Sequence, residues 1–375
     1  MTILVAPDKF RGSLTAPAAA AAIARGLRSA LPAATVLERP LGDGGEGTLD
    51  LLRDRLGLDT KRLTVTGPLR RPVEATYLLG RGRAVVELAS ASGLHLVPPA
   101  RRNPRNTTTI GTGELLEDAL SRGATDITLL LGGSATSDAG VGLAGALGYR
   151  FFGERGTDFI PTADTLGYVT RIDESAVNPL LAEANFTVVC DVNNPLLGPR
   201  GATFTYAPQK GATPEDLPEL EGHQAAFART LTDHFGRNLT ATPGAGAAGG
   251  AAFGALHFLG ARLRPGSETV MDLLGLNERL RRADLVVTGE GRVDATSGCG
   301  KVVGVLAARS RRLRPGVPVV ALCGHSTLAD PSALGLDRLL AILPGRTADE
   351  ADAHLRAADH LRDLAYALGH NLPNV

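Results

Sequence analysis

Short aliphatic and β-branched runs recur along the chain, and each is followed by a loop rich in glycine or carboxylates and then by a stretch with helical spacing. The runs span residues 3–5, 36–37, 85–88, 127–131, 188–189, 285–287 and 319–322. Such alternation is typical of α/β proteins with parallel sheets. Because ligands of parallel sheets bind outside the carboxyl ends of the strands, these loops are the candidate functional segments.

Length and helix signals give a coarse organisation. A chain of 375 residues is long enough for about two to three domains. Thr15 with Pro17 predicts the start of a helix, and Thr213 predicts another start before apolar residues at helical spacing. A capping box over residues 347–350 predicts a C-terminal helix that Gly369 ends.

Composition argues against several classes of partner. The chain has 39 basic and 39 acidic residues, five tyrosines, ten phenylalanines and no tryptophan, which disfavours binding to nucleic acid. Its cysteines, Cys190, Cys299 and Cys323, are odd in number and far apart, so neither a disulfide framework nor a CxxC metal pair is expected. This cysteine usage fits a reducing cytoplasm.

Two segments need testing as membrane or leader sequences. Lys9 and Arg11 precede the apolar run 14–24, but Asp8 interrupts the basic region and the run has an amphipathic pattern. Residues 244–261 carry no formal charge, yet six of these 18 residues are glycine and most others are alanine, so burial in lipid would release little free energy. We therefore expect a soluble, cytoplasmic protein without membrane partners.

The segment 286–301 is the richest in chemical groups. A strand is followed by Gly289, Glu290 and Gly291, and then by Gly300 and Lys301. Glycines allow close approach of a phosphate, so this pattern predicts an anion cradle. It is not a Walker A motif, because Ala295 and Val302 stand where that motif needs glycine and a hydroxyl residue. The alternative is a glycine turn with a solvated lysine.

Lysine is rare in this chain, which has four lysines among its 39 basic residues. Lys9, Lys210 and Lys301 all lie beside glycine-rich motifs, which suggests sites that need a compact point charge rather than the planar fork of arginine. Lys61 lies in no such motif, so chance placement stays open as an alternative.

Two further glycine motifs carry carboxylates. Asp43 and Glu46 lie three residues apart among glycines, and carboxylates in this number suit Mg²⁺; the alternative is a turn that caps the next helix. Segment 132–138 offers amides and hydroxyls to an anion, and its Asp138 could meet a metal or a hydroxyl group. An N-cap at Ser137 or Asp138 explains that segment equally well.

Asp191 follows a strand that has the pattern of a buried one, so its carboxylate would emerge at a strand end, where it could accept a hydroxyl proton as a general base. The eight histidines show no metal-binding spacing, and the absence of a GxSxG motif disfavours a serine hydrolase.

Taken together, these segments resemble the glycerate kinase family of the bacterial two-domain type. The resemblance runs from residue 6 to residue 324 and rests on motifs in order: APDKFRGSL, GDGGEGT, ELASASGLHLVP, TTTIGTGELL, GGSATSDAGVGLAGALG, CDVNNPLLG, PQKGAT, PGAGAAGG, LGARLRPG and VVTGEGRVD with a downstream GK. Three positions depart from the pattern: Arg11 stands where lysine is common, Ser137 where asparagine is common, and Ala139 where glycine is common.

The resemblance implies phosphorylation of D-glycerate that depends on ATP and Mg²⁺, with 2-phosphoglycerate as the expected product. It also implies an α/β fold in which both chain ends, residues 1–75 and 262–375, form a Rossmann-like parallel-sheet domain, with a second α/β domain, residues 76–261, inserted. The active site is expected in the cleft between them, because closure on the substrates would align the reacting groups and exclude water.

The candidate residues have expected roles. Asp191 is the first candidate for the base, Asp138 is the second, and Lys9 is a further catalytic candidate. The residues expected to bind Mg²⁺ are Asp43, Glu46 and Asp294. The residues expected to bind substrate or nucleotide are Asp8, Arg11, Gly44, Gly45, Gly132, Gly133, Ser134, Gly289, Glu290, Gly291, Lys210 and Lys301.

Alternatives remain at this stage. The product could be 3-phosphoglycerate, or the acceptor another small hydroxy acid such as hydroxypyruvate or a tartronate-like acid. A more distant alternative is a two-domain ligand sensor without turnover. The sequence shows no interface stripe, so both a monomer and a homodimer are open.

Overall fold

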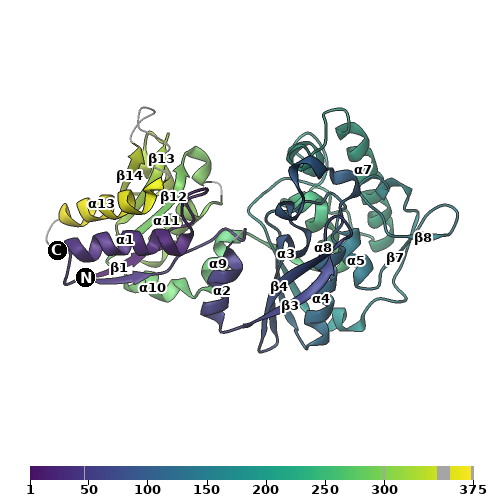
Figure 1. Ribbon diagram of the computed structural model, residues 1–375, viewed down its shortest axis with the longest axis horizontal. Coiled ribbons are helices and arrows are strands. Elements are labelled where there is room, and N and C mark those ends of the chain that lie inside the picture. Colours follow the sequence, from purple (N-terminus) through teal and green to yellow (C-terminus); the bar gives the residue numbers. More distant parts are fainter. Residues whose placement is uncertain (46, 299, 344–354, 373–375) are drawn as a thin grey trace. The chain divides into compact units, whose positions relative to one another are not determined.

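The computed structural model describes residues 1–45, 47–298, 300–343 and 355–372. The chain forms two compact units (Figure 1). Unit 1 comprises Met1–Asp43, Asp50–Arg55 and Gly266–Val375, and unit 2 comprises Gly44–Leu49 and Leu56–Pro265. Both units are built on a sheet with helices, so the predicted α/β fold is confirmed.

Unit 1 contains a five-stranded sheet in which every pair of neighbours is parallel. Its order is β14 (Arg338–Leu343), β13 (Val319–Ser326), β12 (Leu285–Val293), β1 (Thr2–Val5) and β2 (Thr35–Glu38). The first two strands of the chain thus complete a sheet whose other three strands come from its C-terminal third. A parallel sheet formed in this way from both chain ends is the arrangement that the sequence predicts.

Helices cover this sheet. They are α1 (Ala16–Ala30), α9 (Gly266–Leu273), α10 (Leu276–Arg282), α11 (Val302–Leu313) and α13 (Ala357–His370), together with the turns η8 (Ala295–Gly298) and η9 (Pro331–Leu334). Figure 1 shows α1 and α13 side by side, and Ile23 of α1 and Leu361 of α13 join Ile3 and Val5 in one buried apolar cluster. Burial of this cluster is the main favourable term for unit 1.

The helix signals of unit 1 have definite outcomes. Thr15 is the N-cap of α1, and its side-chain oxygen accepts a hydrogen bond from the N–H of Ala18, as predicted. α13 ends at His370, one residue beyond the predicted stop at Gly369. The capping box at Thr347 and Glu350 lies outside the described residues.

β12 is longer than predicted. The expected loop at Gly289, Glu290 and Gly291 is part of the strand, which continues to Val293 beside an equally extended β13. A side chain at position 289 would collide with the carbonyl oxygen of Leu322. The glycines therefore permit close approach of two strands, and a turn is not needed to explain them.

Unit 2 contains a six-stranded mixed sheet. Its order is β11 (Arg262–Arg264), β10 (Asn185–Val189), β6 (Asp126–Leu130), β5 (Arg83–Glu87), β4 (Pro72–Gly80) and β3 (Asp59–Thr66). The strands from β11 to β5 are parallel, whereas β5, β4 and β3 pair antiparallel. The predicted boundary after residue 75 is therefore wrong, because it would cut β4 and separate β3 from its hydrogen-bonding partner.

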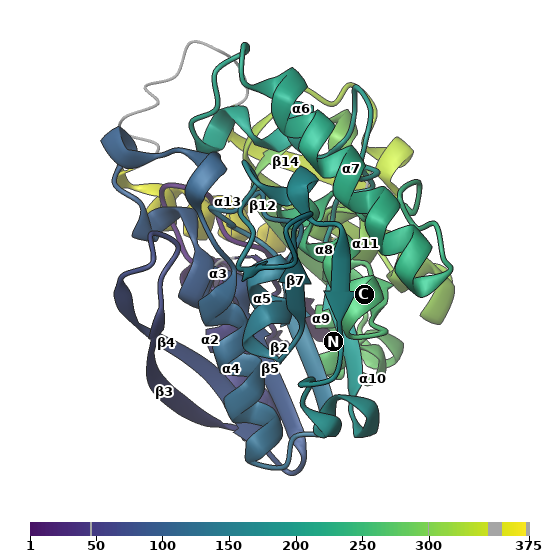
Figure 2. The ribbon, with the colours of Figure 1, turned by 90° about the vertical axis from the view of Figure 1, so that its right-hand side faces the viewer.

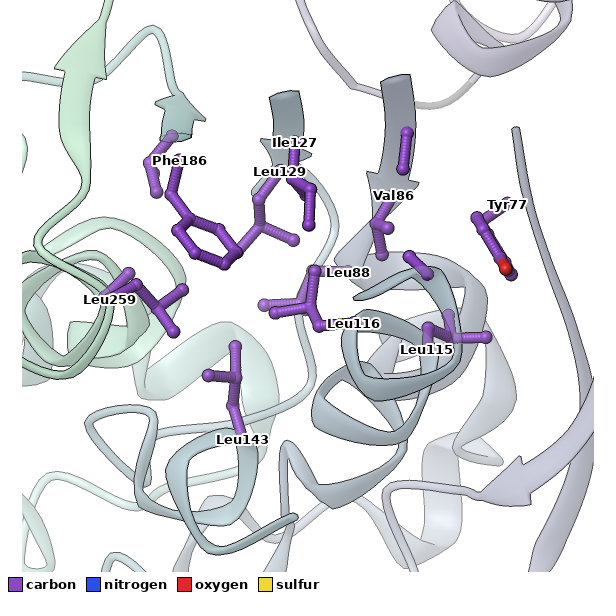
Figure 3. Packing of buried hydrophobic residues seen from close by; sticks show 14 of the residues in the cluster. Tyr77, Val86, Leu88, Leu115, Leu116, Ile127, Leu129, Leu143, Phe186 and Leu259 are labelled. Atoms are coloured by element: carbon purple, nitrogen blue, oxygen red, sulfur yellow. The ribbon is translucent and has the colours of Figure 1, made fainter. Parts of the chain in front are cut away.

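The core of unit 2 lies between this sheet and its helices, α3 (Leu88–Ser92), α4 (Ile110–Ser121), α5 (Val141–Ala146) and α8 (Ala251–Phe258). Figure 3 shows the side chains of Ile127 and Leu129 on β6 facing Leu116 of α4, with Leu143 of α5 and Phe186 of β10 nearby. All of these side chains are buried. The helices fix the positions of the loops that leave the carboxyl ends of the strands.

A second apolar cluster fills another part of unit 2, and Figure 2 shows the elements that contribute to it. Its elements are α6 (Ala202–Tyr206), α7 (Leu217–Phe235) and a small antiparallel sheet of β7 (Arg150–Phe152), β8 (Asp158–Phe159) and β9 (Arg171–Asp173). α7 confirms the predicted helix but begins at Leu217, after the predicted start at Thr213, and Gly236 ends it in the left-handed conformation. The short turns of unit 2 are η1 (Leu94–Leu96), η2 (Pro99–Arg101), η3 (Pro104–Asn106), η4 (Leu166–Tyr168), η5 (Pro179–Glu183), η6 (Pro208–Lys210) and η7 (Ala247–Gly250).

α2 (Thr48–Leu56) contributes residues to both units. None of the helices in the described part of the chain combines the length and the hydropathy needed to cross a membrane.

Candidate active site

Unit 1 brings three predicted site residues together at the carboxyl end of β1. The N–H of Asp8 donates to the carbonyl oxygen of Gly289, which places Asp8 beside β12. The Nζ atom of Lys9 lies 3.4 Å from Oδ1 of Asp43, and the N–H of Lys9 donates to Oδ1 of Asp8 at 2.7 Å. Two separate sequence motifs thus meet at one edge of the sheet.

β12 supplies two further carboxylates to this edge. Glu290 is partly buried. Burial raises the pKa of Glu290, and the charges of Asp294 and Asp43 raise it further. Its Oε1 atom is buried and has no hydrogen-bond partner among the described residues. In Asp294, Oδ2 lies 3.1 Å from Nε of Arg292, and Oδ1 lies 4.0 Å from Nζ of Lys301. The edge therefore carries carboxylates and lysine ammonium groups in alternation.

The electrostatics of Asp8 show how closely these groups lie. Asp8 is 7% exposed, and burial raises its pKa to about 7, with the charges of Asp43 and Glu290 acting in the same direction. A carboxyl group with such a pKa can hold or release a proton near neutrality. Carboxylates that repel one another in this way are also ready to receive a cation.

No group of three or more acidic, histidine or cysteine residues converges to metal-binding geometry within the described parts of the chain. Glu46 and Cys299 lie outside the described residues. Arg11 is exposed, and its backbone N–H lies 3.3 Å from the position that a side chain at Gly291 would take.

Unit 2 brings two other glycine motifs together. A Cβ atom at Gly132 would lie 2.7 Å from the Cα atom of Gly45, so Gly45 can pack on this loop only because residue 132 is glycine. Gly44 and Gly133 both have φ near +80°, which favours glycine at each position. The predicted site residues Gly44, Gly45, Gly132 and Gly133 are thus neighbours.

Lys210 lies beneath the same loop rather than at the surface. Its side chain is buried, and Nζ donates to Oγ of Ser134 at 2.9 Å and to the carbonyl oxygen of Thr136 at 2.6 Å. Burial lowers the pKa of Lys210 to about 7, and the negative charge of Asp138 opposes that shift. The sequence indicated Lys210 as a candidate site residue, but only the tertiary structure shows which atoms it contacts.

Asp138 is fully buried, and all of its hydrogen bonds are internal. Oδ2 accepts from the N–H and the Oγ1 hydroxyl of Thr109, each at 2.8 Å, and Oδ1 accepts from the N–H of Gly140 at 3.2 Å. Thr109 and Gly140 are the N-caps of α4 and α5. Burial raises the pKa of Asp138, and the hydrogen bonds from Thr109 oppose that rise. Thr109 lies in the TTTIGTGELL motif but was not among the predicted site residues.

Asp191 has the position that the sequence predicts, shortly after β10 ends at Val189, and it is partly buried. The N–H of Leu131 donates to the carbonyl oxygen of Val189, so Asp191 and the 132–136 loop follow adjacent parallel strands. Glu87 ends the next strand, opposite Leu130, and was not predicted. The sequence could have indicated Glu87, because it is the acidic residue that opens the motif ELASASGLHLVP directly after a strand run.

Comparison with known proteins decides the family. A sequence model described as "Glycerate kinase family" matches residues 3–372 of the chain. The chain belongs to the glycerate kinase family. The predicted family is therefore confirmed, and with it the predicted class of enzyme, an ATP-dependent kinase.

Relatives of this glycerate kinase family member match along almost their whole lengths. A glycerate kinase of Bacillus subtilis is 42% identical over 98% of this chain and 98% of its own. A glycerate 2-kinase of Escherichia coli is 38% identical over 94% of this chain and 93% of its own. A crystal structure of a Salmonella typhimurium LT2 protein assigned as glycerate kinase 2 matches with a TM-score of 0.86 and 38% identity, covering 98% of this chain and 97% of that one.

Proposed function

We propose that this kinase transfers the γ-phosphoryl group of ATP to the 2-hydroxyl of D-glycerate, giving 2-phosphoglycerate and ADP. The observation that carries this proposal is the family match over residues 3–372, together with similarity to a protein named glycerate 2-kinase. Phosphoryl transfer needs positive charge around the phosphates and an aligned hydroxyl. Strand-end groups of both units supply chemistry of these two kinds.

Lys9 and Lys301 provide the positive charge. The Nζ atom of Lys9 lies 3.4 Å from Oδ1 of Asp43, and that of Lys301 lies 4.0 Å from Oδ1 of Asp294, so each ammonium group lies near a carboxylate of unit 1. A compact ammonium group suits the oxygens of a triphosphate, which arrive at several angles. The exposed Arg11 adds a third cation in the same motif as Lys9.

Asp191 is the proposed base, since its carboxylate follows β10 at the edge where the glycine loop 132–136 lies. Removing the proton of the acceptor hydroxyl as the phosphoryl group arrives is the task of such a base. Asp138, the second candidate, is instead assigned to positioning, because its oxygens face the N–H groups that begin α4 and α5.

We propose that carboxylates of unit 1 bind Mg²⁺ together with ATP. Carboxylate oxygens are the ligands that Mg²⁺ takes from proteins, and Asp43, Asp294 and the unpartnered Oε1 atom of Glu290 offer them. When bound with ATP, the ion would neutralise charge on the phosphate oxygens. Glu46, predicted as a ligand, stays part of this proposal although it lies outside the described residues.

Product analysis tests the function. Purified protein with ATP, MgCl₂ and D-glycerate should form ADP only when D-glycerate is present, and phosphorus NMR should show a signal coupled to the proton on C2. Coupling to the C3 protons would identify 3-phosphoglycerate and contradict the regiochemistry. A panel with hydroxypyruvate and tartronate separates glycerate from other small hydroxy acids, and ADP formation with none of them would favour a sensor.

We also propose that the enzyme acts in the cytoplasm, as a monomer or a homodimer. Cys190 and Cys323 are free cysteines, which suits a reducing compartment.

A further inference from the structure

Lys210 is a buried charge whose role the reaction outlined above does not explain. It ends η6, and the next residue, Gly211, has φ of 103° and packs against the backbone of Arg102, which fixes the approach of the lysine. The side chain of Lys210 is only 2% exposed. A lysine placed so deeply must act through the groups that it touches, which are Ser134 and Thr136.

The contact with Ser134 has a defined direction. At 2.9 Å the Nζ atom of Lys210 donates to the Oγ atom of Ser134, and the charged form of the lysine can only donate. The hydroxyl proton of Ser134 therefore points elsewhere, and it meets no acceptor among the residues that the structure describes. Donation from a cation polarises the hydroxyl group and makes it a stronger donor.

The backbone around Ser134 also offers hydrogen-bond donors to an anion. The loop is fastened from outside, because the N–H of Leu94 donates to the carbonyl oxygen of Gly133 and the N–H of Ala135 donates to that of Ser92. In the described parts of the chain, the N–H groups of residues 132, 133 and 134 donate to no protein acceptor. Consecutive N–H groups in a turn with one left-handed glycine are a common way to bind an anion.

Asp138 does not cancel the charge of Lys210. Its two oxygens are satisfied by Thr109 and Gly140, at the N-termini of two helices that already favour negative charge. The ammonium group instead contacts the loop itself, at Ser134 and at Thr136. The charge of Lys210 therefore acts on the polar groups of the loop, at Ser134 and Thr136.

We propose that Lys210 is a positioning residue for an oxyanion site made by the N–H groups of Gly132, Gly133 and Ser134 and by the hydroxyl of Ser134. The site takes an oxyanion of one of the two substrates, either the carboxylate of glycerate or a phosphate group of ATP. This inference rests on the proposed function and names the binding chemistry of unit 2.

Steady-state kinetics of S134A, K210M and the double variant test the inference, with KM measured separately for D-glycerate and for ATP. S134A should raise one of the two KM values by about tenfold to a hundredfold, the range for a lost hydrogen bond to a charged group, with kcat changed less than about threefold. K210M should raise the same KM, and the double variant should be no worse than S134A, because Lys210 acts through Ser134. The affected substrate identifies the oxyanion.

K61M is the matched control, since Lys61 is a lysine of β3 that forms an ion pair with the exposed Asp59 and should leave both KM values unchanged. If S134A retains both wild-type KM values, the site does not exist; if the effects of S134A and K210M multiply, Lys210 does not act through Ser134. Should K210M fail to fold, S134A alone still decides whether the site exists. A wild-type protein that forms no ADP with D-glycerate would instead refute the proposed function. The oxyanion site can be tested without turnover by thermal unfolding with ATP or D-glycerate added alone. S134A should lose the stabilisation that one of these ligands gives the wild-type protein.

Discussion

Asp138 and Thr109 are joined by two hydrogen bonds, because Oδ2 of Asp138 accepts both the backbone N–H and the hydroxyl of Thr109 at 2.8 Å. Thr109 Oγ1 in turn accepts from the N–H of Leu143, inside α5. One carboxylate therefore ties the start of α4 to the start of α5 within the core of unit 2. This relationship accounts for an aspartate among glycines and hydroxyl residues without giving it a proton-transfer role.

Replacing Asp138 with asparagine should destabilise the protein. The amide NH₂ would face donors that now meet a carboxylate oxygen, at a cost of about 3 kcal/mol. Denaturant unfolding measures this loss. A variant that keeps wild-type stability but loses turnover would show that Asp138 acts in the chemistry.

Replacing Asp191 with asparagine should lower kcat by about 10² to 10⁴, the usual contribution of a general base, while the unfolding midpoint changes little. Asp233, an exposed aspartate on α7, offers the same substitution as a control that should keep wild-type kcat. Near-full turnover by folded D191N would remove Asp191 as the base.

Asp8 should make stability depend on pH in the metal-free protein. Its pKa is about 7 in the folded state and about 3.8 when unfolded, so the folded state binds its proton more tightly. Stability should therefore be highest below pH 4 for this group and fall as pH rises through 7, by up to about 4 kcal/mol relative to D8N.

Unfolding of wild type and D8N at pH 5 and pH 8, in EDTA, measures this effect. Added MgCl₂ should weaken the dependence, since a nearby cation lowers the pKa of a carboxyl group. A stability difference between the two proteins that is constant with pH would contradict the buried position of Asp8.

Replacing Gly289 with alanine should cost about 3 kcal/mol or more, because the new methyl group would overlap the carbonyl oxygen of Leu322 and push β12 from β13. Gly145 in α5 is the matched control, since a Cβ atom there would meet nothing within 4 Å. G145A should be neutral or stabilise by up to about 1 kcal/mol. Equal effects of the two substitutions would show that strand spacing does not require Gly289.

Replacing Ala139 with glycine should stabilise the protein. Ala139 has φ of 49°, a left-handed conformation that costs a residue with a side chain about 1 kcal/mol. The same substitution at Ala144, a buried residue of α5, should instead destabilise by at least about that amount. Thermal unfolding of A139G and A144G tests the opposite signs.

Much of the fold could be read from local sequence. The runs at 3–5 and 188–189 fall within observed strands, the run at 127–131 overlaps β6 up to Leu130, and Thr15 caps α1 as expected. These signals survive because β-branched runs and capping residues act over a few positions. The boundary between the units was misplaced because the prediction did not include the hairpin of β3 and β4, whose strands join the sheet of unit 2.

The candidate site divides in the same way. Sequence motifs indicated Asp8, Lys9, Asp43 and Asp191 at strand ends, and the structure has them there. The same reasoning gave Asp138 and Asp191 similar roles, because both are aspartates near strand ends. Only burial and hydrogen-bond partners separate a carboxylate enclosed by helix N-termini from one at the edge of the sheet.

The sequence by itself determined the α/β class, the family and the segments that carry chemistry, because strand runs, caps and ordered glycine motifs are properties of neighbouring residues. The tertiary structure decided which glycines serve close packing, which lysine is buried and which aspartate is enclosed by helix N-termini. Those outcomes depend on contacts between distant positions, as when the hydroxyl of Thr288 donates to the carbonyl oxygen of Ala6, 282 residues away. Chain folding creates such contacts, and they fix the environment that sets the chemistry of each side chain.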